Sequence, residues 1–142
     1  MLTLEALASA YGRVQALKGV DLEAREGELT AIVGANGAGK TTLLRAISGI
    51  QPLTGGRIVF RGRDITAAPP HRRVALGIAQ VPEGRQVFGP LSIEDNLRLG
   101  AFTRRDAGVT ADLARVFAMF PVLQERRRTP AAALSGGQQQ ML

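Results

Sequence analysis

The sequence has 142 residues, a length that allows one domain with a substantial core. Its net charge of +6 is compatible with nucleic-acid binding, but scattered arginines and an aromatic content of only 4% argue against stacking on bases. The absence of cysteine excludes disulfides and thiolate metal sites. No apolar run approaches the roughly 20 residues that span a bilayer, and no signal-peptide pattern is visible at residues 1–5.

The first part of the chain alternates between apolar and polar residues. This alternation predicts strands at residues 2–10 and 20–24, with a turn at 11–13 between them. Two such half-buried strands predict an antiparallel layer beside whatever core follows them.

Residues 34–41, Gly-Ala-Asn-Gly-Ala-Gly-Lys-Thr, match the phosphate-binding pattern G-x-x-x-x-G-K-[ST]. We call this segment the phosphate loop. The apolar run 29–33 before it predicts a strand buried on both faces. An apolar stripe at positions 43, 46, 47 and 50 predicts an amphipathic helix after it, which Gly49 is placed to end.

Glycines at 34, 37 and 39 allow backbone N–H groups to wrap around a phosphate. The helix that begins near Gly39 adds unpaired N–H groups and its positive dipole end. Lys40 brings an ammonium group to the β- and γ-phosphates, and Thr41 brings a hydroxyl for Mg²⁺. The segment therefore predicts binding of a nucleoside triphosphate.

The chain after this helix first alternates and then becomes helical. Patterning predicts strands at 57–60 and 78–81 with a short helix at 71–76 between them. From residue 83 onward we expect helices. Ser92 is expected to cap one that runs to Leu99, and Thr110 to cap another that Pro121 interrupts.

A second glycine-containing segment, Leu-Ser-Gly-Gly-Gln, occupies residues 134–138. Ser135 is a good helix N-cap, and the glycines after it expose backbone N–H groups at a helix start. Taken alone, the segment fits either a capped helix with a loose first turn or a second anion site.

Together, residues 34–42 and 134–140 resemble the nucleotide-binding subunits of ABC transporters, and the resemblance extends over residues 2–142. It implies an α/β fold with a P-loop NTPase (RecA-like) core, an N-terminal antiparallel β layer and a helical subdomain. Residues 1–83 would form the β layer and the core, and residues 84–142 the helical subdomain as far as the signature motif.

The resemblance also implies the ligands, ATP and Mg²⁺, and the residues that bind them. Tyr11 would stack on adenine, and the Thr41 hydroxyl would contact Mg²⁺. Glu83 stands where the family usually has a glutamine that contacts Mg²⁺ and the attacking water, so it is a candidate catalytic and metal-binding residue. The remaining ATP contacts would be Gly34, Asn36, Gly37, Ala38, Gly39, Lys40, Thr41 and Thr42 and, from a second subunit, Ser135, Gly136, Gly137 and Gln138.

Residues 81–88 and 91–97 are similar to the smaller ATPase subunit of branched-chain amino acid importers. This implies a second ATP-binding subunit, identical or different, transmembrane permease subunits contacted through residues 83–88, and an indirect link to a periplasmic substrate-binding protein. The subunit would be peripheral, at the cytoplasmic face of the membrane. Alternatives are a urea or amide importer and a soluble ABC-type ATPase that acts on nucleic acid.

Members of this family carry an apolar strand ending in Asp-Glu after the signature, and then a histidine. The sequence ends at Leu142 without either, and its only histidine, His71, precedes the signature. We therefore expect a C-terminally truncated chain that does not hydrolyse ATP by itself, because the Asp would orient Mg²⁺ and the Glu would polarise the attacking water.

Overall fold

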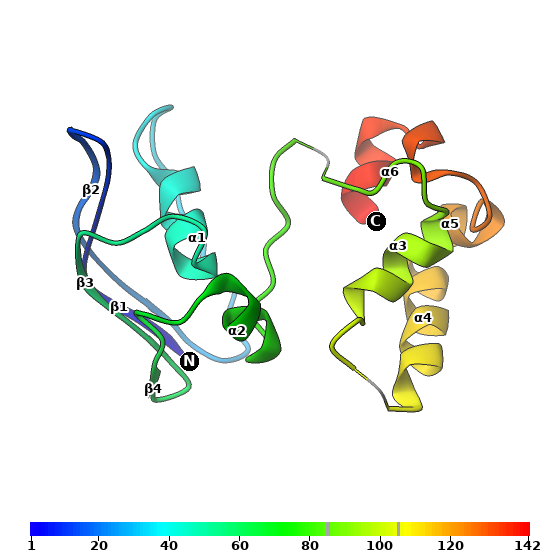
Figure 1. Ribbon diagram of the computed structural model, residues 1–142, viewed down its shortest axis with the longest axis horizontal. Coiled ribbons are helices and arrows are strands. Elements are labelled where there is room, and N and C mark those ends of the chain that lie inside the picture. Colours follow the sequence, from blue (N-terminus) through cyan, green and yellow to red (C-terminus); the bar gives the residue numbers. More distant parts are fainter. Residues whose placement is uncertain (85, 105) are drawn as a thin grey trace. The chain divides into compact units, whose positions relative to one another are not determined.

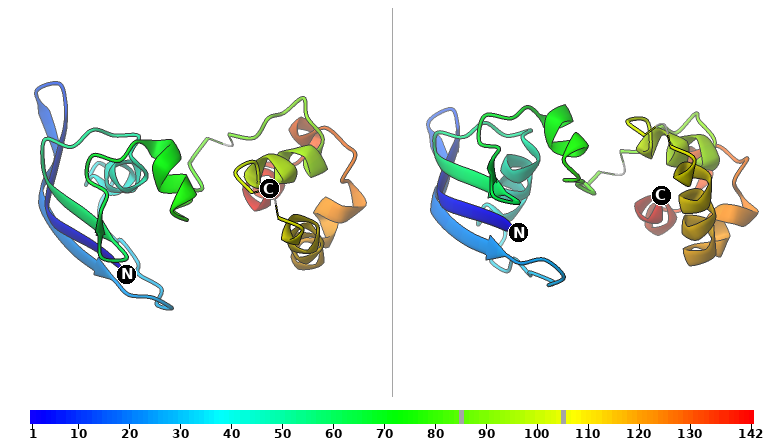
Figure 2. Two further views of the ribbon diagram at one scale, coloured as in Figure 1. Left: turned by 60° about the horizontal axis from the view of Figure 1, so that its bottom comes forward. Right: turned by 90° about the horizontal axis from the view of Figure 1, so that it is seen from below.

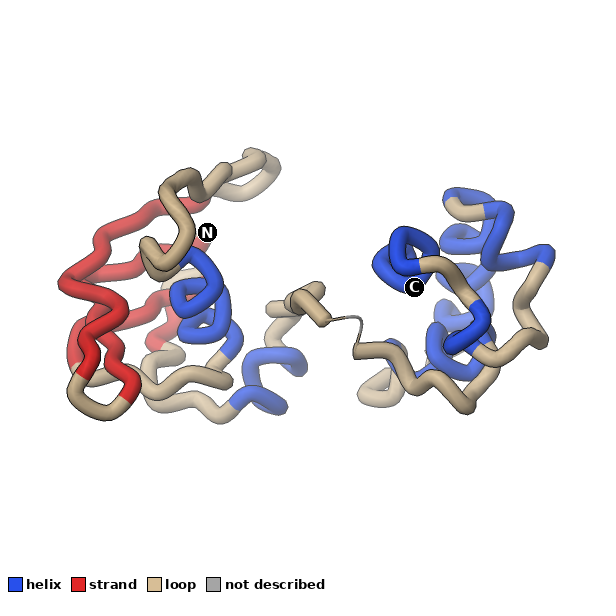
Figure 3. Tube along the Cα trace, turned by 90° about the horizontal axis from the view of Figure 1, so that it is seen from above, coloured by secondary structure: helices blue, strands red, loops and turns tan. Residues whose placement is uncertain are grey.

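The computed structural model describes residues 1–84, 86–104 and 106–142. The chain forms two compact units, residues 1–80 and residues 81–142, which we call the first and second unit (Figure 1). The named strands belong to the first unit, and the second consists of helices and loops (Figure 3). Arg85, within the segment expected to contact permease subunits, lies outside the described residues.

The first unit contains an antiparallel sheet in the order β2-β1-β3-β4. Its strands are β1 (Leu2–Tyr11), β2 (Val14–Ala24), β3 (Gly55–Phe60) and β4 (Arg63–Asp64). β1 and β2 form a hairpin in which Leu2 pairs with Ala24 and Tyr11 with Val14. The predicted antiparallel layer and the strand at 57–60 are therefore confirmed, and β2 begins earlier than its alternation indicated.

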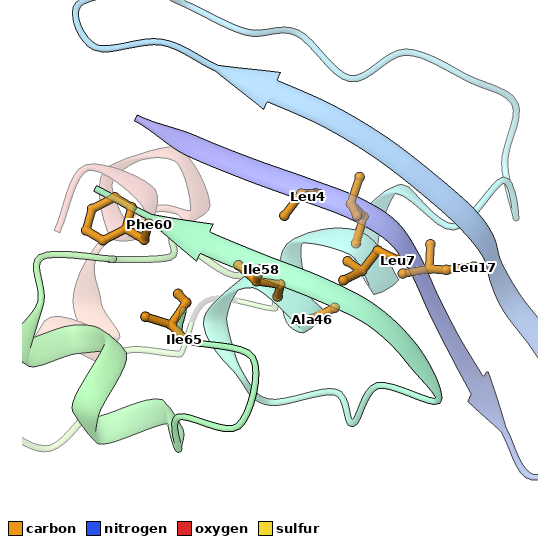
Figure 4. Packing of buried hydrophobic residues seen from close by; sticks show 8 residues of the cluster. Leu4, Leu7, Leu17, Ala46, Ile58, Phe60 and Ile65 are labelled. Carbon is orange, nitrogen blue, oxygen red and sulfur yellow. The ribbon is translucent and has the colours of Figure 1, made fainter. Parts of the chain in front are cut away.

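Helix α1 (Lys40–Ser48) lies against one face of this sheet (Figure 2). Leu4 and Leu7 of β1, Leu17 of β2 and Ile58 of β3 lie beside Ala46 of the helix (Figure 4). With Leu43 of the helix they belong to a single buried cluster. The cluster is completed by Phe60 and Ile65. Burial of these side chains, each contributing about 1.5–3 kcal/mol, fixes the helix on the sheet.

The end of α1 agrees with the sequence except at one residue. Gly49 forms the C-cap with φ of 83°, so the chain leaves the helix where a glycine is favoured. Ile50 was expected to extend the apolar stripe, but it lies beyond the cap and is 61% exposed. The stripe is confined to the residues inside the helix.

Two predicted strands, 29–33 and 78–81, are not formed in this structure. A strand requires hydrogen bonds to a neighbouring strand, and the sheet of the described residues has no member beside either segment. Leu29 and Val33 are 98% and 88% exposed. Ile32 and Ile78 pack against the core cluster, so both segments still contact the first unit.

Helix α2 (Pro70–Ala75) completes the first unit and begins one residue before the predicted start. The second unit contains α3 (Ile93–Gly100), α4 (Gly108–Met119), α5 (Pro121–Glu125), a short 3₁₀ turn (Ala131–Ala133) and α6 (Gly136–Met141). Its buried centre is formed by Ile93, Phe117, Leu123 and Leu134. Among the described residues, no helix has the length and apolar character needed to cross a bilayer.

The predicted caps of the second unit have different outcomes. Ser92 caps α3 by accepting a hydrogen bond from the Asp95 N–H, as expected. Thr110, however, lies inside α4 and does not cap it. The N-cap is Ala107, which provides no side-chain cap, and the carboxylate of Asp106 just before it accepts the N–H of Gly108 at 2.9 Å. Pro121 ends the run as predicted, and α5 starts there.

Replacing Ile58 by alanine is expected to lower the free energy of unfolding by about 2–5 kcal/mol, because it leaves a cavity in the core. Ile58 is fully buried, whereas Ile50 is largely exposed. Ile50→Ala is therefore a matched control, with an expected loss of about 0.5 kcal/mol or less. Urea unfolding measures both losses, and equal values would contradict this description of the core.

Candidate functional site

The phosphate loop leads directly into the first turn of α1. Gly37 has φ of 83° and Gly39, the N-cap residue, has φ of 94°. Both angles lie in the left-handed region that glycine adopts without strain. Between them the Ala38 N–H donates to the Ala35 carbonyl at 3.2 Å, which closes a turn. The loop is thus a series of tight turns that ends at a helix N-terminus.

Gly39 also lies very close to the sheet. A Cβ atom at this position would be 2.8 Å from the carbonyl oxygen of Ala16 and 3.1 Å from Cδ2 of Leu17, both in β2. Glycine is therefore required twice, once for its backbone angle and once for this approach. The contact fixes the start of α1 on β2, and no sequence motif indicated that Ala16 takes part.

Lys40 folds back over the phosphate loop. Its ammonium group donates hydrogen bonds to the carbonyl oxygens of Gly34 at 2.8 Å and Ala35 at 2.7 Å. The positive charge is therefore held between the start of the loop and the start of the helix. The sequence predicts that this ammonium group meets the phosphate oxygens of a bound nucleotide.

The donor set of this site fits a polyphosphate. In the described structure α1 has no side-chain cap and no acidic residue in its first turn, so the N–H groups there have no acceptor within the helix. These N–H groups, the positive dipole end and Lys40 all favour an anion. Thr41 is exposed at the first turn, and its hydroxyl is a suitable ligand for Mg²⁺.

Tyr11 lies at the end of β1, beside α1. A hydrogen bond with the Thr42 side chain lowers the pKa of Tyr11, and Arg45 acts in the same direction. The ring is 46% exposed, so one part of it contacts the helix while the rest faces solvent. Thr42 itself is buried. The structure therefore brings Tyr11 and the phosphate loop to the same helix.

A polar cluster that the sequence did not reveal connects β1 to the exit of α1. The Gln51 amide donates to the Ser9 hydroxyl and to the Ala10 carbonyl, both at 3.1 Å. Ser9 is fully buried and donates to the Pro52 carbonyl at 2.7 Å. These bonds fix the strand residues next to Tyr11 on the chain that leaves α1, and buried hydroxyl groups need such partners.

Ser135 is the N-cap of α6, as the sequence predicted. Its hydroxyl accepts the Gln138 N–H, and the Gln138 side chain accepts the Ser135 N–H at 3.0 Å, which together form a capping box. An added Cβ at Gly137 would meet no atom within 4 Å. The first turn of α6 therefore has an open face at Gly137, while Gln138 is occupied by the cap.

Glu83 lies exposed in a turn with Gly84, at the beginning of the second unit. Further along, the Asn96 side chain holds the backbone of Phe88 through two hydrogen bonds, from the Phe88 N–H at 2.9 Å and to its carbonyl at 3.1 Å. Phe88 is exposed and Val87 half-buried. Asn96 was not singled out from the sequence, although an asparagine side chain commonly fixes a loop in this way.

The predicted site residues thus fall into two groups. Tyr11 and residues 34–42 belong to the first unit, whereas Glu83 and residues 135–138 belong to the second. Among residues 1–84, 86–104 and 106–142 there is no group of three or more His, Cys, Asp or Glu side chains that could hold a metal.

A family model described as ABC transporter matches residues 17–142. One similar curated relative is the high-affinity branched-chain amino acid transport ATP-binding protein BraG of Pseudomonas aeruginosa, which is 39% identical. Another is the probable branched-chain amino acid transport ATP-binding protein LivF of Archaeoglobus fulgidus, which is 37% identical. Both alignments cover all of this chain but only 61% and 60% of the relatives. A Fe(3+) ion import ATP-binding protein of Mesorhizobium japonicum is 41% identical over 98% of the chain and 39% of its own length.

Solved structures show the same fold. An ATP-binding subunit of an ABC transporter has a TM-score of 0.87 at 28% identity, over 99% of this chain and 58% of the other. An ATP-binding cassette of an ABC transporter in its ADP conformation has a TM-score of 0.78 at 26% identity, over 99% of this chain and 61% of the other. This chain has the P-loop NTPase fold over a part of the length of these proteins.

Two glycine substitutions separate the two demands on the phosphate loop. Gly37→Ala is expected to cost about 1–2 kcal/mol of stability, because alanine is placed in the left-handed region. Gly39→Ala meets the same strain and also the Ala16 carbonyl, whereas Gly37 has no atom within 4 Å of an added Cβ. Gly39→Ala should therefore lose about 1–3 kcal/mol more in urea unfolding. Equal losses would mean that the packing on β2 does not matter.

Proposed function

The chain belongs to the ABC transporter family, and from that premise we propose that it is part of an ATP-binding subunit that powers import. The phosphate loop carries the proposal. Three features of this loop each favour a polyphosphate: its left-handed glycines, the uncapped start of its helix and the position of Lys40. Since the chain spans about 60% of its curated relatives, hydrolysis is proposed for the whole protein.

ATP would be held at its two ends by different parts of the first unit. Its phosphates would meet Lys40 and the N–H groups of residues 34–42, and its adenine would stack on Tyr11. The family resemblance and the shared contact of Tyr11 and the loop with α1 support this arrangement. Bound Mg²⁺, held by the Thr41 hydroxyl, would neutralise charge on the phosphates.

Two of the similar relatives support branched-chain amino acids as the imported substrate, because BraG and LivF are named for that transport. Other relatives carry the names of other substrates, including Fe(3+) ions. A urea or amide importer is the alternative. An ATPase subunit does not touch the cargo, so the substrate preference rests on these relatives and on the similarity of residues 81–88 and 91–97 to the branched-chain importers.

We propose that a second ATP-binding subunit completes the site. The phosphate loop already has its own helix N-terminus, and residues 135–138 supply another with an open face at Gly137. One triphosphate can use both if it lies between two copies. Permease subunits would bind residues 83–88 at the cytoplasmic face of the membrane, where the exposed Phe88 is held in place by Asn96.

Lys40→Ala should weaken triphosphate binding by about tenfold to a hundredfold, since it removes a charged donor. Adenosine binding should stay unchanged, because it does not involve the phosphates. Lys18→Ala is the matched control, being an exposed lysine in β2. Calorimetric titration of the three proteins with ATP and adenosine measures this, and an equal loss for both ligands would contradict the phosphate assignment.

The proposed shared site is tested by mixing two inactive variants of the whole protein, Lys40→Ala and Gly137→Asp. A heterodimer retains one site made from an intact phosphate loop and an intact 135–138 segment, so phosphate release should partly return. Mixing Lys40→Ala with the double variant is the control, because it leaves no intact site. Heterodimers that form without any return of activity would overturn the shared site. Residues 1–142 alone should release no phosphate.

A further inference from the structure

Arg73 is the one arginine buried to this degree in the described structure. It lies in α2, is 3% exposed, and uses its guanidinium group entirely on backbone carbonyls. Nε donates to Ala68 at 2.8 Å and Nη2 to Thr66 at 3.0 Å. Nη1 donates to both Ala46 and Ile47 at 2.8 Å. A charged side chain is rarely buried in this way unless its donors are satisfied.

Two of these carbonyls belong to the last turn of α1. The last four carbonyls of a helix have no partner within it, and a cation there also faces the negative end of the helix dipole. The Gly49 N–H already donates to the Ala46 carbonyl. Arg73 adds a further donor there, supplies a donor for Ile47, and places its positive charge at this end. Burial lowers the pKa of Arg73, but an arginine remains protonated throughout the physiological range.

Arg73 contacts the end of α1 so closely that another side chain could not replace it. A Cβ atom at Gly49, the C-cap of α1, would be 2.8 Å from Nε of Arg73. The planar guanidinium reaches carbonyls of α1 on one side and of residues 66–68 on the other. A lysine ammonium is a single point and cannot span both groups. At the same helix end the Ser48 hydroxyl donates to the Gln80 side chain at 2.6 Å.

We propose that Arg73 is a positioning residue for the phosphate site. The core cluster holds α1 by one face, through Leu43 and Ala46, but apolar contacts alone resist sliding along the helix axis only weakly. Arg73 fixes the axial position at the C-terminal end. Since α1 has nine residues and is about 14 Å long, a shift at that end displaces the N–H groups at the other. The inference rests on the proposed binding of ATP at the phosphate loop.

Arg73→Lys in the full-length protein tests this. Its affinity for MgATP, measured by calorimetric titration at a temperature where the protein is folded, should fall by about fivefold to tenfold. Affinity for adenosine, which does not use the α1 amides, should stay within the error of the wild type. Arg72→Lys is the control, because Arg72 is an exposed residue of the same helix. A purely stabilising role would lower the unfolding temperature and leave MgATP affinity unchanged, which would overturn the proposal.

A second pair of variants decides the matter if Arg73→Lys does not fold. Gly49→Ala keeps the arginine but pushes its guanidinium away, and should weaken MgATP binding in the same way. Gly62→Ala has similar backbone strain, with φ of 72° and no atom near an added Cβ, and should bind normally. Equal MgATP affinity for these two variants would contradict the proposal. A wild-type protein that binds no MgATP would instead refute the proposed function itself.

Discussion

The position of one helix N-terminus governs what this chain can bind. A phosphate is attracted by N–H groups only when several of them converge, so the first turn of α1 must be held where the phosphate loop can close around it. The close approach of Gly39 to Ala16 in β2 achieves this. It places the turn on the hairpin formed by β1 and β2.

The other parts of the first unit act on the same helix from different directions. The core cluster fixes its buried face, and Arg73 satisfies the carbonyls at its far end. Gln51 and Ser9 connect its exit to β1, which carries Tyr11. The proposed phosphate and adenine contacts therefore both depend on the position of helix α1. This arrangement brings residues from distant parts of the sequence to the proposed ATP site.

The sequence predicted best those features that depend on local chemistry. The positive φ angles at Gly37 and Gly39 and the N-caps at Ser92 and Ser135 follow from residue type and spacing. The pattern of 29–33 indicated a buried strand, but strand formation depends on a neighbour that this chain does not provide among its described residues.

Long-range polar contacts were also beyond the sequence. Asn96 holds the backbone of Phe88, eight positions before it. The four hydrogen bonds of Arg73 join segments separated by as many as 27 positions. Side chains of these types are usually exposed, so pattern alone assigns them to the surface. Only the folded arrangement shows that they organise loops and helix ends.

The central claim is that the first turn of α1 binds the phosphates of ATP. Backbone-amide NMR with tripolyphosphate, adenosine and MgATP as separate ligands would test it most directly. Inorganic tripolyphosphate should shift the amide signals of residues 37–42 in a saturable way, and adenosine should shift the ring signals of Tyr11, the single tyrosine of the chain. MgATP should shift both sets together. If MgATP binds but leaves the amides of residues 37–42 unmoved, the phosphates lie elsewhere and the account of the site is wrong.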